Sequence, residues 1–466
     1  MNENKKYTKD IIYIVHAWMS SVKCKKYIKT RILYIHIMKL ENSKGTKDFS
    51  PEEKIVREEV INTMKSVFEL YGFSPLETPI LNRYELFENK YGGGSEILKE
   101  TFKLKDQGER KLGLRFDLTV PLAKYVGMNP ELKMPFKRYE IGKVFRDGPV
   151  KTGRMREFWQ CDVDIIGTGS MLADAEILAV TNKVFNKLGL PIIIKLSNRK
   201  LLEGILDSAG VSKDKRFDAI IAIDKLEKLG ENKVRKEMKQ KSIPDDVVAK
   251  IMSIINMRGS NDELINNLKD LIKSDIGIEG LKETKEILDY CNSFGFGCVE
   301  FSPSLARGLA YYTGPVYEVF LKDSRIRSAA AGGGRYDKMI GAFLGGAKDY
   351  PATGIAFGLE VIIEALKEKK RFEKKSVTQV FIIPIKTQKE SIRIAEELRR
   401  AGIKTETALL GRGISKNLAY ANSMNIPFAI IIGEKELKQK KVKLRDMRSG
   451  KEELLNLRGV IKKLQG

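Results

Sequence analysis

The spacing of apolar residues predicts a folded domain that begins near residue 50. Ser50 and Pro51 suit an N-cap and a first helical position, and apolar residues recur at helical spacing through residues 55–71. Farther along, residues 75–167 contain short runs in which polar and apolar residues alternate. Such alternation is typical of an antiparallel sheet that packs one face on a core and leaves the other face free.

The alternating pattern stops and later resumes, which indicates an insertion. Residues 201–298 are rich in Lys, Glu and Ile at helical spacing, whereas strand-like runs return afterwards and lead into a final helix. We therefore predict an α+β main domain in two parts, 39–200 and 299–368, separated by a helical insertion at 201–298.

The two ends of the chain follow other patterns. After a charged linker at 367–376, strand, helix, strand, helix and strand follow one another, which predicts a small α/β domain with a mostly parallel sheet over 376–466. Residues 1–38 are basic and show no clear period, so we expect an N-terminal extension of unknown role. Both Met1 and Met38 remain candidates for the native start.

Composition and charge narrow the class of partner. A chain of 466 residues with 42% apolar residues is long enough for several packed domains. Its net charge of +23 and isoelectric point near 9.5 favour a polyanionic partner, such as nucleic acid, an anionic membrane or a phosphorylated substrate. The alternative is a lysine-rich composition that covers every surface without a specific role.

Cysteine and histidine usage excludes several kinds of chemistry. The four cysteines contain no CxxC pair, and no apolar run approaches the roughly 18 residues of a membrane span, so we expect a cytoplasmic protein without zinc or disulfides. The two histidines both precede Met38. The rest of the chain therefore lacks the imidazole that Ser-His or Cys-His catalysis and histidine-ligated metals require.

Two segments carry candidate chemistry. Residues 136–167 form two strand-like runs around the basic, glycine-containing loop 150–154, with Gln160, Asp162 and Asp164 alternating on one strand face. Such a face beside a basic loop suits a nucleotide together with a small amino-bearing molecule, although an ordinary charged hairpin has the same spacing.

The second segment is LARGLAYYTGPVYE, residues 305–318. Its one positive charge, Arg307, is surrounded by glycine and aromatic residues, which indicates a packed guanidinium. The arginine either acts on a bound anion or pairs with a nearby carboxylate such as Glu318.

The motifs GTKDF, LRFDLT, VFRDGPVKTGRMREFWQCDVD, LARGLAYYTGPVYE, AAGGGRYD and PATGIAFGLE occur in this order. From about residue 42 to 466 the chain resembles the histidyl-tRNA synthetases, which are class II aminoacyl-tRNA synthetases. The resemblance implies a six-stranded antiparallel catalytic sheet, a helical insertion, a C-terminal anticodon-binding domain and a homodimer. It implies that L-histidine, ATP accompanied by Mg²⁺, and tRNA(His) are the substrates, and that no metal is held by the protein alone.

The resemblance also implies residue roles at the positions that match. For catalysis and ATP binding, these are Arg146 and Arg307 on the phosphates, Arg154 near the ATP tail and Phe158 on the adenine. For histidine binding, they are Asp117, Thr119 and Gln160 at the α-amino group, Asp164 and Tyr312 at the imidazole, and Tyr336 in the same pocket.

Two positions depart from the family pattern. Ala310 stands where the family has Asp, and Val361 stands where the third class II motif has an ATP-clamping arginine. These departures leave two alternatives open. The chain could be a non-charging paralogue that serves as a regulatory subunit of histidine biosynthesis, or a tRNA-binding sensor. The retained Arg146 and Arg307 and the complete C-terminal domain favour histidine activation and tRNA charging.

Overall fold

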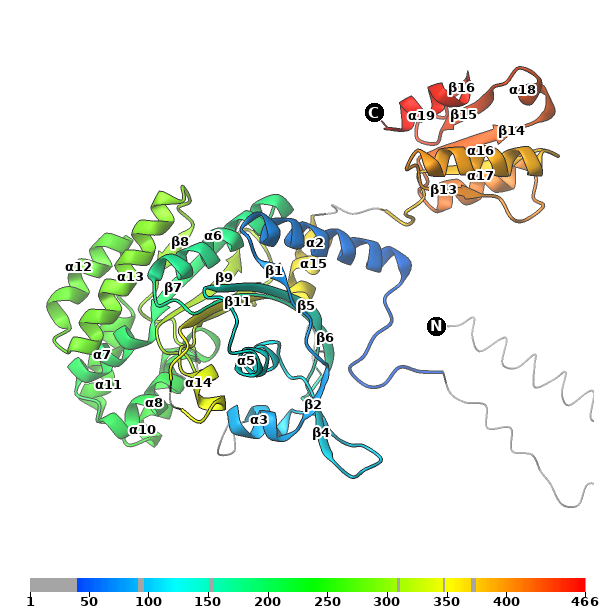
Figure 1. Ribbon diagram of the computed structural model, residues 1–466. Helices are drawn as coiled ribbons and strands as arrows, with labels where there is room; N and C mark the ends of the chain where they lie inside the picture. The colour runs from blue at the N-terminus through cyan, green and yellow to red at the C-terminus, as the bar shows by residue number, and fades with distance from the viewer. Residues whose placement is uncertain are drawn as a thin grey trace, which may run out of the picture. The chain divides into compact units, whose positions relative to one another are not determined.

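The computed structural model describes residues 40–90, 96–150, 155–307, 311–346, 348–369 and 374–465 (Figure 1). The predicted N-terminal extension, together with Arg154 and Ala310, lies outside these residues. Among the described helices, none is both long enough and apolar enough to cross a membrane.

The main domain is built on an eight-stranded sheet with the order β1-β5-β6-β11-β10-β9-β7-β8. The strands are β1 (Ser74–Pro75), β5 (Phe136–Phe145), β6 (Glu157–Ile166), β11 (Ala352–Gly358), β10 (Ala331–Arg335), β9 (Pro315–Leu321), β7 (Ile192–Asn198) and β8 (Val299–Phe301). The antiparallel strands from β5 to β7 confirm the expected six-stranded sheet. The sheet is larger than expected because β1 and β8 add parallel pairs at its two edges.

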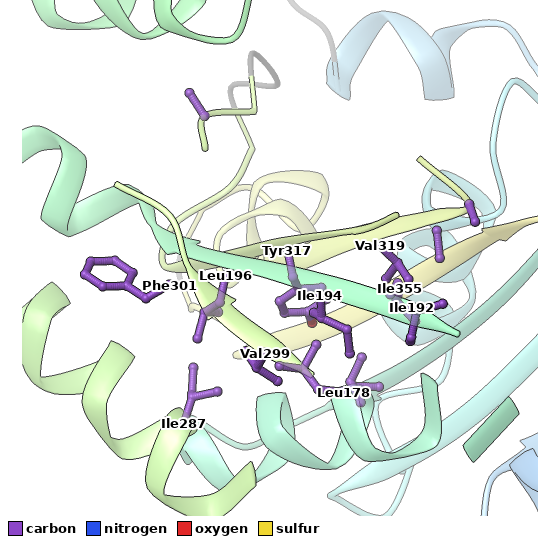
Figure 2. Close-up of a cluster of buried hydrophobic side chains, with 14 of the residues drawn as sticks. Leu178, Ile192, Ile194, Leu196, Ile287, Val299, Phe301, Tyr317, Val319 and Ile355 are labelled. Carbon is purple, nitrogen blue, oxygen red and sulfur yellow. The ribbon is translucent and has the colours of Figure 1, made fainter. Parts of the chain in front are cut away.

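One face of this sheet packs against helices α2 (Pro51–Leu70), α6 (Met171–Leu188), α13 (Asp275–Ser293) and α15 (Leu359–Glu368). Helix α2 begins as predicted, because Ser50 and Glu53 form a capping box and Pro51 occupies the first turn. Figure 2 shows Leu178 of α6 and Ile287 of α13 packed against sheet residues that include Ile194. This layer is the main hydrophobic core.

Strand β6 shows how the alternation separates the two faces. Cys161, Val163 and Ile165 belong to the core cluster and are at most 2% exposed. The intervening residues therefore project from the opposite face of the sheet. On that side, α5 (Thr119–Met128) and α14 (Met339–Phe343) pack together in a second apolar cluster.

A small three-stranded sheet, in the order β2-β4-β3, accompanies these helices. Its strands are β2 (Leu81–Arg83), β3 (Lys103–Lys105) and β4 (Lys111–Leu114), and helices α3 (Glu85–Lys90) and α4 (Glu96–Lys99) lie between β2 and β3 in the chain. The motif LRFDLT spans the end of β4 at Leu114 and the start of α5 at Thr119.

The segment between β7 and β8 is helical, as the spacing indicated. It contains α7 (Arg199–Ala209), α8 (Lys213–Ile223), α9 (Leu226–Leu229), α10 (Glu231–Gln240), α11 (Asp245–Ile255) and α12 (Asn261–Leu271), and it ends with α13. Helices α7 and α13 approach closely, since a Cβ added at Gly204 would lie 2.4 Å from the Cα of Gly277. The proposed domain limits, 201 and 298, remain predictions.

The C-terminal domain has a five-stranded sheet with the order β13-β12-β14-β15-β16. Its strands are β12 (Val380–Pro384), β13 (Thr405–Thr407), β14 (Phe428–Ile432), β15 (Val442–Asp446) and β16 (Glu452–Leu455). Its helices are α16 (Gln388–Arg400), α17 (Ile414–Ser423), α18 (Glu434–Lys438) and α19 (Leu457–Gln465). The first three strands are parallel, as predicted, but β15 and β16 pair antiparallel, so the sheet is mixed.

A buried ion pair joins the main sheet to α6. Arg335 of β10 donates its Nε–H to Asp174 at 3.2 Å, and its two Nη groups donate to the carbonyls of Thr168 and Ser170 at 3.0 and 3.1 Å. Thr353 donates its hydroxyl to the other oxygen of Asp174 at 2.7 Å. Asp174 is 0% exposed, so water cannot replace it as the partner of Arg335.

We expect Asp174→Ala to lower the free energy of unfolding by about 3–5 kcal/mol, because it leaves a buried guanidinium without its counter-charge. Urea unfolding followed by the fluorescence of Trp159, which lies in β6 of the same sheet, measures the loss. Asp289→Ala is the control, because the pair of Asp289 with Lys285 is exposed and its loss should leave the transition unchanged. Equal transitions for both variants would contradict this role of Asp174.

Candidate active site

A cavity of about 380 Å³ opens on the face of the main sheet that does not pack on the core helices. The predicted site residues that line it are Asp117, Thr119, Arg146, Gln160, Asp164, Arg307, Tyr312 and Tyr336. The fold therefore brings together side chains from the start of α5, from β5 and β6, and from the segments around β9 and β10. Phe158 lies next to this group through its contact with Arg146.

Glycines on β10 and β11 leave the space that the cavity occupies. A Cβ added at Gly332 would lie 2.1 Å from Nη1 of Arg307, and one at Gly354 would lie 2.0 Å from Oδ1 of Asp164. Real Cβ atoms do not approach other heavy atoms so closely. The glycine-rich run AAAGGGR is therefore the floor of the site, because any larger residue would displace the side chains that line it.

One end of the cavity carries carboxylates. Asp164 is 4% exposed, accepts a hydrogen bond from the hydroxyl of Tyr336 at 2.5 Å and has its other oxygen 2.9 Å from Nη2 of Arg138. Burial raises the pKa of Asp164, and Arg138 opposes that rise. Burial also raises the pKa of Tyr336 well above its ordinary value, so its phenol stays protonated and acts as a donor.

A second buried ion pair, between Arg115 and Glu140, supports the carboxylate end of the cavity. Glu140 of β5 accepts hydrogen bonds at one oxygen from the backbone and hydroxyl of Thr78, at 3.0 and 2.8 Å, and from Arg115 at 2.8 Å. Arg115 also donates to the carbonyls of Thr78 and Lys143, both at 2.8 Å. These contacts tie the segment after β4 to strand β5 and hold both of them against the cavity.

Arg146 is held between two aromatic rings. Its guanidinium carbon lies 4.2 Å from the ring centre of Phe116 and 4.9 Å from that of Phe158, and its Nε–H donates to the carbonyl of Phe116 at 3.4 Å. Cation–π contacts of this kind orient a guanidinium without neutralising its charge. The two rings therefore fix the position of this guanidinium at the cavity.

Arg307 both faces the cavity, where an anion could bind, and pairs with Glu318. It lines the cavity, and its Nη1 lies 3.5 Å from Oε1 of Glu318 and 3.4 Å from the carbonyl of Tyr317. Its guanidinium carbon is also 5.4 Å from the ring centre of Tyr312. The distance to Glu318 is long for a charge-assisted hydrogen bond, so the pairing leaves donors of Arg307 free to bind a ligand.

Comparisons with known proteins agree with this arrangement. A family model described as histidyl-tRNA synthetase matches residues 45–362, and one described as an anticodon binding domain matches residues 379–466. The chain belongs to the histidyl-tRNA synthetase family. It is 47% identical over 418 residues to histidine–tRNA ligase 1 of Bacillus cereus, an alignment that covers 89% of this chain and 97% of the relative.

Solved structures show the same fold. The crystal structure of histidyl-tRNA synthetase from Nostoc sp. has a TM-score of 0.82 at 29% identity, and the match covers 91% of this chain and 99% of that one. A structure from Bacillus halodurans C, titled as an ATP phosphoribosyltransferase regulatory subunit/histidyl-tRNA synthetase, has a TM-score of 0.70 at 23% identity, and the match covers 83% and 96%. At that identity the second likeness concerns the fold alone.

Both departures from the family pattern were visible in the sequence. Val361 lies in the first turn of α15 and packs against the main core, so it offers no charge to a phosphate. Among the described residues that line the cavity, Arg146 and Arg307 are the cations. Arg154, a predicted ATP contact, lies outside the described residues, as does Ala310.

Sequence reasoning missed several side chains that complete the site. Phe116 and Tyr311 line the cavity, and Arg138 pairs with Asp164. Asp162, which the alternation placed beside Gln160 and Asp164 without a role of its own, also lines it. Arg138 could have been found from the strand pairing, because it lies opposite Asp164 in the antiparallel register of β5 and β6. Within the described residues, no group of three His, Cys, Asp or Glu side chains could hold a metal ion.

Proposed function

We propose that the protein is a histidine–tRNA ligase, which activates L-histidine with ATP and transfers the histidyl group to tRNA(His). The observation that carries this proposal is that one cavity brings two kinds of group together. Arg146 and Arg307 supply positive charge for phosphates, and Asp164 with Tyr336 supplies hydrogen-bonding groups for an imidazole. Membership of the histidyl-tRNA synthetase family supports the same reaction.

In the first step, a carboxylate oxygen of histidine attacks the α-phosphorus of ATP, and the bond to the leaving pyrophosphate breaks. Negative charge spreads over the phosphoryl oxygens in the transition state. Arg307 and Arg146 are already held by aromatic rings and by Glu318, so they stabilise that charge with little reorganisation. The histidyl-adenylate then reacts with a hydroxyl at the 3′ end of tRNA and releases AMP.

Selection of histidine depends on the carboxylate end of the cavity. Asp164 and Tyr312 would hydrogen-bond the two ring nitrogens, and Tyr336 keeps Asp164 oriented. An amino acid without these nitrogens would leave buried polar groups unpaired, which disfavours it strongly. Asp117, Thr119 and Gln160 would hold the α-amino group.

ATP enters as a substrate accompanied by Mg²⁺. Magnesium is bound mainly by phosphates and one or two carboxylates, so it does not require a dedicated protein cage. Glu100 is one carboxylate that lines the cavity. Phe158 would stack on the adenine, and Arg154 would reach the ATP tail.

The remaining parts of the proposal follow from family membership. The C-terminal domain would bind the anticodon of tRNA(His), aided by the net charge of +23. We also infer a cytoplasmic homodimer, and sedimentation analysis of the purified chain tests the oligomeric state.

Histidine-dependent exchange of labelled pyrophosphate into ATP tests the proposal directly. A regulatory subunit of histidine biosynthesis or a tRNA-binding sensor would bind ligands without catalysing this exchange. Exchange that depends on histidine, and on no other amino acid, is the expected result. Its absence from a folded protein would favour one of the two non-charging alternatives.

For Arg307→Ala we expect adenylate formation to slow by about 10²–10³-fold, because a preorganised charge is removed from the transition state. Arg307→Lys should recover part of the rate, since an ammonium lacks the planar fork of a guanidinium. Single-turnover kinetics measures the rate, and thermal unfolding gives the fraction of folded protein.

A second variant displaces the guanidinium of Arg307 without removing its charge. Gly332→Ala keeps the guanidinium but places a Cβ 2.1 Å from its Nη1, so the side chain must move. We expect this variant to slow the same step. If Arg307→Ala instead loses thermal stability and keeps the normal rate per folded molecule, Arg307 serves the pairing with Glu318 alone.

For Asp164→Asn we expect kcat/KM for histidine to fall, because a charged hydrogen-bond acceptor is lost from a buried site. The fall corresponds to a loss of about 2–3 kcal/mol of transition-state stabilisation. The KM for ATP should change little, since the substitution lies at the opposite end of the cavity. Steady-state exchange kinetics with each substrate varied in turn measures both. Equal losses for histidine and ATP would indicate a folding defect.

Deleting residues 376–466 should leave histidine activation largely intact and sharply weaken tRNA charging. The two buried clusters of the C-terminal domain contain residues of that domain alone, so its removal exposes no core of the main domain. Pyrophosphate exchange and aminoacylation, assayed side by side, check the two effects. Normal charging by the shortened chain would refute the proposed anticodon-binding role.

A further inference from the structure

Three buried acceptor atoms on strand β6 have no hydrogen-bond donor within the described chain. They are Oε1 of Gln160, Oδ1 of Asp162 and Oδ2 of Asp164, and the last of these lies in an ion pair with Arg138. Gln160 and Asp162 are separated by one position, so both project from the same face of the strand, and both line the cavity. Asp162 is 3% exposed, so bulk water does not satisfy its oxygen. A buried acceptor without a donor is costly unless a ligand supplies one.

The neighbouring carboxylates each accept a protein hydrogen bond at one oxygen. Asp164 accepts from Tyr336 and pairs with Arg138, and Glu140 accepts from Arg115 and Thr78, while Oδ2 of Asp164 and Oε2 of Glu140 form no hydrogen bond. Oδ1 of Asp162 has no hydrogen-bond partner among the described residues.

Arg138, the cation that most affects the pKa of Asp162, also lies near two other carboxylates. Nη2 of Arg138 lies 2.9 Å from Asp164, and its Nη1 lies 4.0 Å from Glu140. Burial raises the pKa of Asp162 well above that of an exposed aspartate, Arg138 opposes the rise, and Asp164, Asp117 and Glu140 add to it. The site therefore has an excess of carboxylates that a cationic ligand would balance.

The cavity leaves room for such a ligand beside Asp162. In the sheet register, Asp162 pairs with Ala356 of β11, and Ala356 pairs in turn with Gly332 of β10. The small side chain of Ala356 leaves space next to the carboxylate, and the guanidinium of Arg307 lies over Gly332. Arg146, the cavity-lining arginine directly after β5, is instead held by Phe116 and Phe158.

We propose that Asp162 is a further substrate-binding residue, which accepts a hydrogen bond from the α-ammonium group of the amino acid. This inference rests on the proposed function and adds a residue to it. A primary ammonium carries a full positive charge and three N–H donors. Asp117, Gln160 and Asp162 supply three acceptors for them. The imidazole is a poorer partner, because a neutral ring has a single N–H and no charge to balance a second buried carboxylate.

The test uses two compounds that differ in the amino group alone. Histidinol keeps the imidazole and the α-amino group, whereas 3-(imidazol-4-yl)propan-1-ol keeps the imidazole and lacks the amine. Calorimetry measures the affinity of each compound for the wild-type protein, for Asp162→Asn and for the matched control Asp164→Asn. Asn preserves the shape of Asp and removes its charge, and a measured melting temperature reports whether each variant is folded.

We expect Asp162→Asn to weaken histidinol binding by about 10- to 100-fold, as for the loss of a hydrogen bond to a charged group. Binding of the amine-free compound should hardly change, and its retention shows that the pocket is intact. Asp164→Asn should weaken both compounds to a similar extent, because both contain the ring.

If Asp162→Asn still binds both compounds and weakens them equally, or affects neither, the inference is overturned. If the variant binds neither compound, Asp162→Glu decides: rescue of histidinol binding supports the contact, and failure in a folded protein overturns it. A wild-type protein that binds neither compound would instead overturn the proposed function. The two failures are therefore distinguishable.

Discussion

The antiparallel register of β5 and β6 is the constraint on which the rest of the main domain depends. It places Arg138 opposite Asp164 and Glu140 opposite Asp162 on one face, while Cys161 and its neighbours enter the core on the other. A slip of one residue would exchange the faces, burying carboxylates among the core helices and exposing apolar side chains. Core packing and site chemistry therefore enforce the same pairing.

The same register separates the charged groups of β6 and of the segment after β5 along the cavity. Aromatic rings hold Arg146 at one end, and Tyr336 and Arg138 hold Asp164 at the other. An amino acid joined to a nucleotide phosphate has the complementary order of charges. The glycines of β10 and β11 provide the volume between the two ends, because side chains there would collide with Arg307 and Asp164.

The elements that were well predicted are those with a strong local signal. The capping box of α2 and the alternation of β6 depend on neighbouring residues, so they could be recognised from the sequence. The edge strand β1 has two residues, too few to show a period. In the C-terminal domain, β15 and β16 are rich in charged residues, and their antiparallel pairing depends on contacts that no local pattern reports.

The sequence by itself determined the class of chemistry, because the absence of histidine after Met38 and the ordered motifs restrict catalysis to arginines, carboxylates and tyrosines. Tertiary structure decided which of those groups have partners. Tyr336 reaches Asp164 across 172 positions, and Arg115 reaches Glu140 from the segment after β4, whereas Oδ1 of Asp162 has no such partner among the described residues. Alternation can place three polar residues on one face, but their hydrogen-bond partners come from distant segments that only folding brings together.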